Sequence, residues 1–172
     1  ILYEMVSVGS EIAFLDSSTI FFSGGTAATT RRMQLGYDPL GPAPSRLRRF
    51  GTGVLFRARD AMHGTEPWRS DGTQAGTTIV ADLFVDGGGS DPRAMTPLGE
   101  RLVFVANDGT GNEPWITDGT STGTYQIADL APVPYDASPS DLARMDGFVY
   151  FAASDPTNGR ALWRTAGPAA GT

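Results

Sequence analysis

Short apolar runs alternate with turn-forming residues throughout the chain. The best-formed example is residues 101–106, followed by a loop rich in Asn, Asp and Gly and then by a second apolar run at 115–116. The Asp-Gly pair at 118–119 indicates a tight hairpin, because both residue types tolerate positive φ. A third run covers 124–130, and a fourth lies near 141–145. With no sustained helical period, the pattern predicts four short antiparallel strands per module, the fourth closing the module.

The same order of runs returns every 47 or 48 residues. Residues 66–77 align with 113–124 almost position for position. The copy at 161–172 keeps only part of the signature, and the copy at 21–30 keeps still less of it, with Phe21 in the place of Trp. Repeats of this length are typical of stacked supersecondary units. The signature positions are Phe21, Trp68, Asp71, Gly72, Thr73, Trp115, Asp118, Gly119, Thr120 and Trp163.

Four antiparallel strands in about 40 to 50 residues match a β-propeller blade. A single blade cannot bury both of its faces, so neighbouring blades must stack. We therefore expect an all-β propeller or propeller segment of about four four-stranded antiparallel blades, as a single repeat domain over 1–172. The modules are expected at approximately 1–50, 51–98 and 99–146, with an incomplete one at 147–172. Either the chain is a fragment of a longer propeller, or it closes on itself with the N-terminal strand completing the last blade. The fragment is favoured, because that last sheet would still lack a strand and expose an edge.

Pro67 and Pro114 stand directly before the Trp of their modules. Proline has no backbone N–H and is poorly tolerated inside a sheet. The strand is therefore expected to begin at the proline, or to bulge there.

The composition excludes several classes of function. The chain has no cysteine, which excludes a thiolate nucleophile, a disulfide framework and cysteine-ligated metal. The net charge of −6 argues against a nucleic-acid partner. No apolar run is long enough to span a membrane.

The repeated signature resembles the bacterial ELWxxDGT repeat, whose usual form is Glu-Leu-Trp-x-Ser/Thr-Asp-Gly-Thr-x-x-Gly-Thr. Residues 66–77 and 113–124 match it apart from Pro in place of Leu, while 161–172 match in part and 21–30 weakly. The resemblance implies a large bacterial protein, secreted or attached to the cell surface, with a propeller fold. It offers no shared catalytic residues, so it implies a scaffold and an extracellular location rather than a reaction.

Several repeated residues admit a chemical role beside an architectural one. The Trp side chains would stack on sugars, but packing between blades is favoured because buried aromatic residues contribute most to packing energy. Asp71 and Asp118 would serve as metal ligands, but an Asp at this point of a turn also accepts hydrogen bonds from its own backbone. The architectural role is favoured for both sets.

The loop that begins at Asn107 is the best candidate for calcium, because hard cations prefer oxygen ligands in Gly-rich loops. Its candidate ligands are Asn107, Asp108, Asn112 and Glu113. The sole histidine, His63, is expected to be a solvent-exposed loop residue, since no Gly-x-Ser-x-Gly elbow accompanies it.

These features favour a non-catalytic secreted or cell-surface repeat protein, acting as a structural or adhesive scaffold or as a protein-interaction platform. We expect a protein or a surface glycan to bind loops such as 60–65 and 107–112, within a larger assembly and without a cofactor. A glycan- or calcium-dependent lectin-like module is the alternative. A hydrolase that uses converging carboxylates is the third hypothesis.

Overall fold

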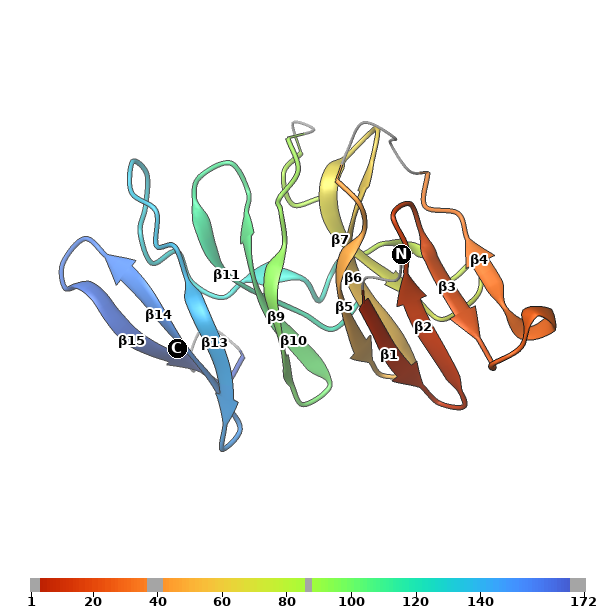
Figure 1. The fold of residues 1–172 in the computed structure, drawn as a ribbon. Coiled ribbons are helices and arrows are strands. Elements are labelled where there is room, and N and C mark those ends of the chain that lie inside the picture. Colours follow the sequence, from red (N-terminus) through yellow and green to blue (C-terminus); the bar gives the residue numbers. More distant parts are fainter. Residues whose placement is uncertain (1–3, 37–41, 86–87, 168–172) are drawn as a thin grey trace. The chain divides into compact units, whose positions relative to one another are not determined.

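The computed structural model describes residues 4–36, 42–85 and 88–167. Figure 1 shows that these residues form strands joined by turns and loops, with a short 3-10 helix among them. The strands build four antiparallel sheets, which confirms the expected all-β class and its four-sheet organisation. The chain divides into two compact units, residues 1–89 and 90–172, and each unit contains two of the sheets.

The first unit contains two four-stranded sheets whose strands follow chain order. The first sheet consists of β1 (Glu4–Val8), β2 (Glu11–Leu15), β3 (Ile20–Ser23) and β4 (Arg31–Met33), with the 3-10 helix η1 (Ala27–Thr29) between its last two strands. The second sheet consists of β5 (Ser45–Phe50), β6 (Gly53–Asp60), β7 (Gly64–Ser70) and β8 (Thr78–Ile79).

The second unit repeats this plan. The third sheet consists of β9 (Arg93–Leu98), β10 (Arg101–Asn107), β11 (Asn112–Thr117) and β12 (Tyr125–Gln126). The fourth sheet has three strands within the described residues, namely β13 (Ser140–Met145), β14 (Phe148–Asp155) and β15 (Gly159–Thr165).

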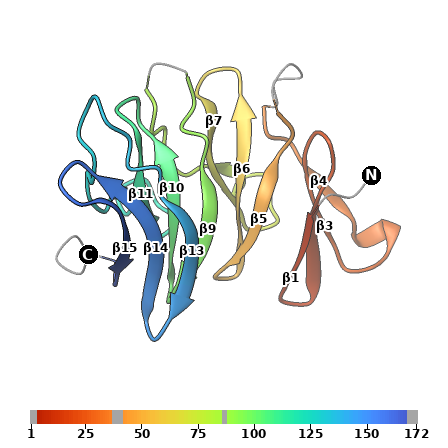
Figure 2. The same cartoon turned by 60° about the vertical axis from the view of Figure 1, so that its left-hand side comes forward.

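The strand near 141–145 belongs to a different sheet from the one we expected. It does not close the third module but pairs with β14, with Met145 opposite Phe148, and so opens the fourth sheet (Figure 2). The reason is the turn between the two strands. Asp146 and Gly147 both adopt left-handed conformations, with φ of 50° and 80°, which is the geometry of a tight two-residue hairpin.

The expected strand start or bulge at the two prolines is also wrong. Pro67 and Pro114 lie inside β7 and β11, and the pairing with the preceding strand continues through both without a shift. Their carbonyl oxygens face the other neighbour, accepting from the backbone N–H of Val80 and Ile127 at 2.8 Å. The ring nitrogen of each proline faces the same side, where the fourth strand is only two residues long. The pairing with β6 and β10 therefore loses no hydrogen bond, because a proline N–H would not point toward those strands.

The signature aromatic residue occupies the same register position in every sheet. On the neighbouring strand, Phe56 lies opposite Trp68, Phe104 opposite Trp115 and Phe151 opposite Trp163, and in the first sheet Phe14 lies opposite Phe21. Cross-strand partners point to the same face of a sheet. We call the face that carries this aromatic pair the Trp face, and the other side the opposite face.

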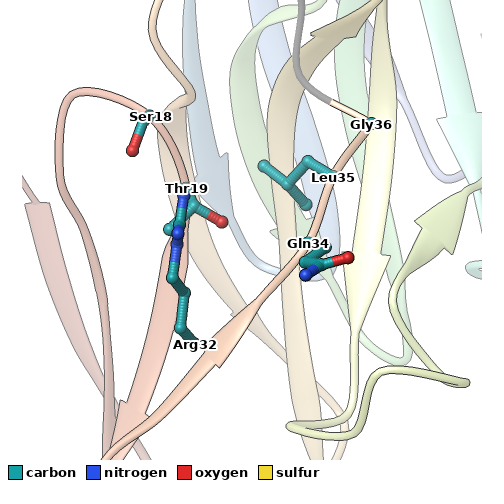
Figure 3. A pocket seen from close by; sticks show the side chains of 6 residues that line it. All are labelled: Ser18, Thr19, Arg32, Gln34, Leu35 and Gly36. Carbon is teal, nitrogen blue, oxygen red and sulfur yellow. The ribbon is translucent and has the colours of Figure 1, made fainter.

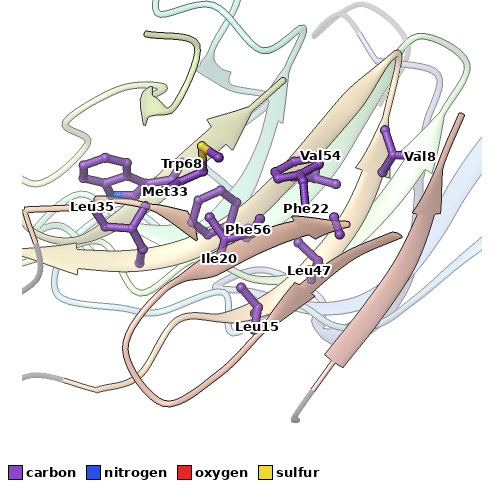
Figure 4. Packing of buried hydrophobic residues seen from close by; sticks show 12 residues of the cluster. Val8, Leu15, Ile20, Phe22, Met33, Leu35, Leu47, Val54, Phe56 and Trp68 are labelled. Carbon is purple, nitrogen blue, oxygen red and sulfur yellow. The ribbon is translucent and has the colours of Figure 1, made fainter. Parts of the chain in front are cut away.

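Within each unit, the Trp face of the later sheet is buried against the opposite face of the earlier one. In the first unit, Phe56 and Trp68 share one apolar cluster with Ile20 and Phe22 of the first sheet (Figure 4). In the second unit, Val149 of the fourth sheet clusters with residues of the third. The core of each unit is therefore a layer between two stacked sheets.

Candidate functional site

In the second sheet, side chains of the signature close the turn after β7. The Asp71 Oδ1 accepts hydrogen bonds from the Thr73 backbone N–H at 2.8 Å and from the Thr73 hydroxyl at 2.7 Å. The Thr73 Oγ1 accepts from the Gly76 N–H at 3.0 Å, and the Thr77 hydroxyl donates to the Thr73 carbonyl at 2.7 Å. The hydroxyls of Thr77 and Ser70 lie 2.6 Å apart. The hydrogen bonds from Thr73 lower the pKa of Asp71.

The third sheet repeats this network bond for bond. The Asp118 Oδ1 accepts from the Thr120 N–H at 2.9 Å and from the Thr120 hydroxyl at 2.6 Å. The Thr120 Oγ1 accepts from the Gly123 N–H at 3.0 Å, and the Thr124 hydroxyl donates to the Thr120 carbonyl at 2.6 Å. The hydroxyls of Thr117 and Thr124 lie 2.7 Å apart. The carboxylates of both signature aspartates are thus used inside their own turns.

The network explains why glycine recurs in the signature. A Cβ atom at Gly76 would lie 2.1 Å from the Asp71 Oδ1, and one at Gly123 would lie 2.0 Å from the Asp118 Oδ1. The carboxylate therefore occupies the space that a side chain would need. Gly72 and Gly119 have a different reason, since both adopt φ of 87°, which most residues avoid.

The first sheet makes the same turn with two residues exchanged. Gly24 stands where Asp71 is expected, and Thr29 stands where Gly76 is expected. The Thr29 Oγ1 accepts from the Thr26 N–H at 3.2 Å and lies 2.9 Å from the Thr26 hydroxyl, so it replaces the carboxylate oxygen. The Thr30 hydroxyl donates to the Thr26 carbonyl at 2.7 Å, as its counterparts do.

The fourth sheet keeps the beginning of this turn. The Gly167 N–H donates to the Thr165 Oγ1 at 3.0 Å, as the Gly72 N–H does to Ser70 and the Gly119 N–H to Thr117. The remainder of the partial copy at 161–172, residues 168–172, lies outside the described residues.

The three tryptophans share a register position but differ in exposure. Trp68 and Trp115 are buried, whereas Trp163 is half-buried and donates its Nε1–H to the Ala153 carbonyl at 3.2 Å. Phe21 is half-buried and stacks on Phe14 with ring centroids 5.1 Å apart. The buried pair packs as a core residue would, which leaves little of either ring for a sugar.

A buried glutamate in each of two sheets holds the segment that follows the fourth strand. Glu66 accepts from the Leu83 backbone N–H at 3.2 Å, and Glu113 accepts from the Leu130 N–H at 3.0 Å. Both side chains are almost fully buried. Sequence reasoning missed this role. Its signal was the Ala-Asp-Leu triplet, which recurs in both modules at the same separation from the glutamate.

Glu113 ionises in an unusual range. Burial raises its pKa to about 7, although backbone hydrogen bonds, the one from Leu130 first, act in the opposite direction. The negative charge of Asp129 raises the pKa further. The Glu113 Oε1 has no hydrogen-bond partner among the described residues. The carboxyl group therefore changes charge near neutral pH.

The calcium candidates of the 107–112 loop bond to separate segments of the chain. The Asn107 Oδ1 accepts from the Gly109 N–H at 2.6 Å, and the Asp108 Oδ1 accepts from the Thr110 N–H at 3.0 Å. The Asn112 amide donates to Asp136 at 2.7 Å, while Glu113 bonds to Leu130. Across the described ranges, no group of three His, Cys, Asp or Glu side chains is arranged to hold a metal ion.

An aspartate begins the loop between the second and third strands of every sheet. Asp16, Asp60, Asp108 and Asp155 each accept a hydrogen bond from the backbone N–H two residues later. This is an Asx turn, which orders a loop without a ligand. The equivalence escaped sequence reasoning because the four loops differ in length.

His63 is more enclosed than we expected. Its side chain is half-buried rather than solvent-exposed, and its Nδ1 lies 2.8 Å from the Asp60 Oδ2. The hydrogen bond to Asp60 raises the pKa of His63. The pair orders the tip of the β6–β7 hairpin.

A hollow of about 360 Å³ lies beside the β2–β3 loop and the segment after β4 (Figure 3). It is lined by Ser18, Thr19, Arg32, Gln34, Leu35 and Gly36. Most of these groups are polar, and Leu35 is the buried apolar member. The hollow presents hydroxyl, amide and guanidinium groups to solvent.

Comparisons with protein-family models, with curated proteins and with solved structures found no match for this chain. Among the described residues, no helix has the length and apolar character that crossing a membrane would require.

Proposed function

We propose that this protein is a non-catalytic repeat scaffold, secreted or displayed at the cell surface, that presents loops to a protein partner. One observation carries the proposal. The signature residues, which are the most distinctive in the chain, are used inside their own sheets, since Asp71 and Asp118 close turns and Trp68 and Trp115 are buried. Recognition of a partner then falls to the positions that differ between modules.

The sheets are proposed to be blades of a propeller or of a propeller segment. Two observations support this arrangement. The signature recurs every 47 or 48 residues, and in each unit the Trp face of one sheet stacks on the opposite face of the sheet before it. Such stacking buries both faces of an inner sheet, as repeat architectures require.

The loops between the second and third strands are one place where the modules differ. In the second sheet this loop carries Met62, which is 80% exposed, and the His63–Asp60 pair. In the third sheet the equivalent loop carries Thr110 and no histidine. The Asx turns fix the backbone of both loops, so the side chains at their tips can differ without loss of the fold.

The test is binding of the labelled protein to washed envelopes of the cells that encode it. Charges are introduced at the loop tips by Met62→Asp and Thr110→Lys, while Asp60 and Asp108 remain in place. We expect saturable binding that falls at least tenfold in the double variant. The matched control is Glu100→Ala in the exposed β9–β10 turn, which leaves binding unchanged.

The source of the binding is decided by two treatments of the envelopes. Protease treatment abolishes binding if the partner is a protein, as proposed, whereas periodate oxidation abolishes it if the partner is a glycan. Unchanged binding by the double loop variant would exclude these loops.

A glycan-binding module is the second candidate, favoured by the hollow beside the β2–β3 loop. Arg32, Gln34 and Ser18 offer it several hydrogen-bonding groups for sugar hydroxyls. A glycan array with wild type and Arg32→Ala tests this candidate, with and without calcium. Specific signals that are lost in the variant would favour it over the protein-binding scaffold.

A further inference from the structure

A buried carboxyl group holds the chain segment that leads from the third sheet to the fourth. We call this segment, residues 127–139 between β12 and β13, the connection. Its Leu130 backbone N–H donates to the Glu113 Oε2 at 3.0 Å. Glu113 is only 1% exposed, and its Oε1 has no hydrogen-bond partner among the described residues. One carboxyl oxygen therefore binds the connection, and the other is enclosed without a partner.

The surroundings of this carboxyl group favour its neutral form. Leu130, which bonds to it, belongs to an apolar cluster with Ala137 of the connection and Phe151 of β14. On β10 the residue opposite Glu113 is Ala106, whose side chain offers neither a charge nor a hydrogen-bond donor. A buried carboxylate with one unpaired oxygen is unfavourable, and the group avoids this state by binding a proton.

The two acidic side chains of the connection do not oppose this preference. Asp129 stands next to Leu130, and its negative charge acts against the ionisation of Glu113. Asp136 accepts from the Asn112 amide at 2.7 Å. Burial, and to a smaller extent Asp129, raise the pKa of Glu113 to about 7, although backbone hydrogen bonds act in the opposite direction.

Opening of the connection gives water access to this carboxyl group. In the open state the carboxylate is hydrated, so its pKa returns toward the ordinary value of 4.5. The closed state therefore binds the proton more tightly than the open state does. Closing is most favourable below about pH 4.5, and the advantage is lost as the pH rises through about 7.

We propose that Glu113 is a pH-sensitive switch for the connection, which is held closed while the carboxyl group is protonated and opens more readily once the group is ionised. The effect extends to the neighbouring loop. Asp136 of the connection accepts from the Asn112 backbone N–H at 3.3 Å, and a Cβ at Gly111 would lie 3.3 Å from the Tyr135 carbonyl oxygen. Opening of the connection therefore also removes the support of one side of the 107–112 loop.

Hydrogen exchange of the Leu130 amide, followed by NMR, tests the proposal. The measured quantity is protection, which is the exchange rate of an unfolded chain divided by that of the protein at the same pH. We expect the protection of wild type to fall at least tenfold between pH 5 and pH 8. Glu113→Gln keeps an acceptor but cannot ionise, and its protection is expected to change less than twofold. Glu100→Gln, in an exposed turn, is the control and follows wild type.

Urea distinguishes opening of the connection from unfolding of the sheets around it. Local opening exposes little surface, so exchange at Leu130 is expected to be nearly independent of urea well below the unfolding transition. The amides of β10 exchange through larger unfolding, and their exchange is expected to accelerate with urea. If Leu130 showed the same protection and the same urea dependence as β10, the connection would not open by itself and the proposal would be overturned.

A second variant changes the pH of the transition without removing the bond to Leu130. Asp129→Asn eliminates the charge that raises the pKa of Glu113. Its loss of protection is therefore expected to be smaller than that of wild type and to end at a lower pH. Constant protection of wild type between pH 5 and pH 8, or an equal fall in Glu113→Gln, would contradict the proposal.

Discussion

The first and second sheets make the same turn with different residues. In the second sheet the acceptor is the Asp71 carboxylate, and Gly76 leaves room for it. In the first sheet the acceptor is the Thr29 hydroxyl. Here Gly24 leaves room for the acceptor, since a Cβ at Gly24 would lie 3.2 Å from the Thr29 Oγ1. The repeat thus preserves an acceptor at one point in space rather than a residue at one point in the sequence.

The two sheets also differ in what lies against their Trp faces. Phe56 is fully buried in the core of the first unit, while Phe14, at the same register position, is half-buried. The third sheet resembles the second in its turn and in its buried glutamate, Glu113. At the equivalent position the first sheet has Thr19, whose hydroxyl donates to the Met33 carbonyl. These differences supply matched pairs of sites for experiment.

The largest expected effect comes from truncating the paired phenylalanines. Phe56→Ala is expected to cost about 3 to 5 kcal/mol of stability, the usual range for a fully buried aromatic residue. Phe14→Ala is expected to cost less than half as much, because the ring is already partly solvated. Urea denaturation of both variants measures the difference. Equal losses would mean that the two Trp faces are equally covered.

The next effect is a dependence of stability on pH that originates at Glu113. Its pKa is raised from 4.5 to about 7 by burial, so the folded state holds this proton more tightly than the unfolded state does. The stabilisation is complete below about pH 4.5 and is lost as the pH rises through 7, in total on the order of 3 kcal/mol. Glu113→Gln keeps an acceptor for the Leu130 N–H but cannot ionise.

The Gln variant is therefore expected to be more stable than wild type at pH 8 and close to it at pH 5. Thermal midpoints of both proteins between these pH values provide the measurement. Glu100→Gln, at an exposed position, is the control and leaves the wild-type profile in place. If the thermal midpoint of Glu113→Gln changed with pH in parallel with that of wild type, the pH dependence would originate at a group other than Glu113.

The sequence predicted the features that depend on local pattern. Alternating apolar runs with turn residues predicted strands and antiparallel sheets, and the spacing of the tryptophans predicted four equivalent sheets. It failed where the outcome depends on which neighbour a strand chooses. The strand at 140–145 has the same sequence pattern whether it is the last strand of one sheet or the first strand of the next. Its pairing with β14 depends on the tight turn formed by the left-handed pair Asp146-Gly147.

The candidate site was less predictable than the fold. The oxygen-rich loop at Asn107 predicted shared ligands, but Asn112 and Glu113 lie on β11 and bond to different segments, because successive strand residues point to opposite faces. The exchange between Gly24 and Thr29 was invisible in the alignment, since neither residue resembles its counterpart. It becomes visible only when the position of the acceptor oxygen is known.

The smallest expected effect tests the exchange itself. Gly76→Thr places a side chain where the Asp71 carboxylate lies, and Asp71→Gly removes the acceptor for the Thr73 N–H. Each is expected to destabilise the protein by about 1 to 2 kcal/mol. The double variant rebuilds the arrangement of the first sheet, with Thr29 as its template. Thr122→Ala, in the exposed part of the equivalent turn of the third sheet, controls for general effects of turn substitution.

The double-mutant cycle of Asp71→Gly and Gly76→Thr, followed by urea denaturation, tests most directly the claim that the signature residues build the turn. The predicted result is a double variant more stable than the sum of the single effects allows, by about 1 kcal/mol or more. Additive losses in the double variant would contradict the claim, because they would show that the carboxylate and the hydroxyl do not occupy the same place.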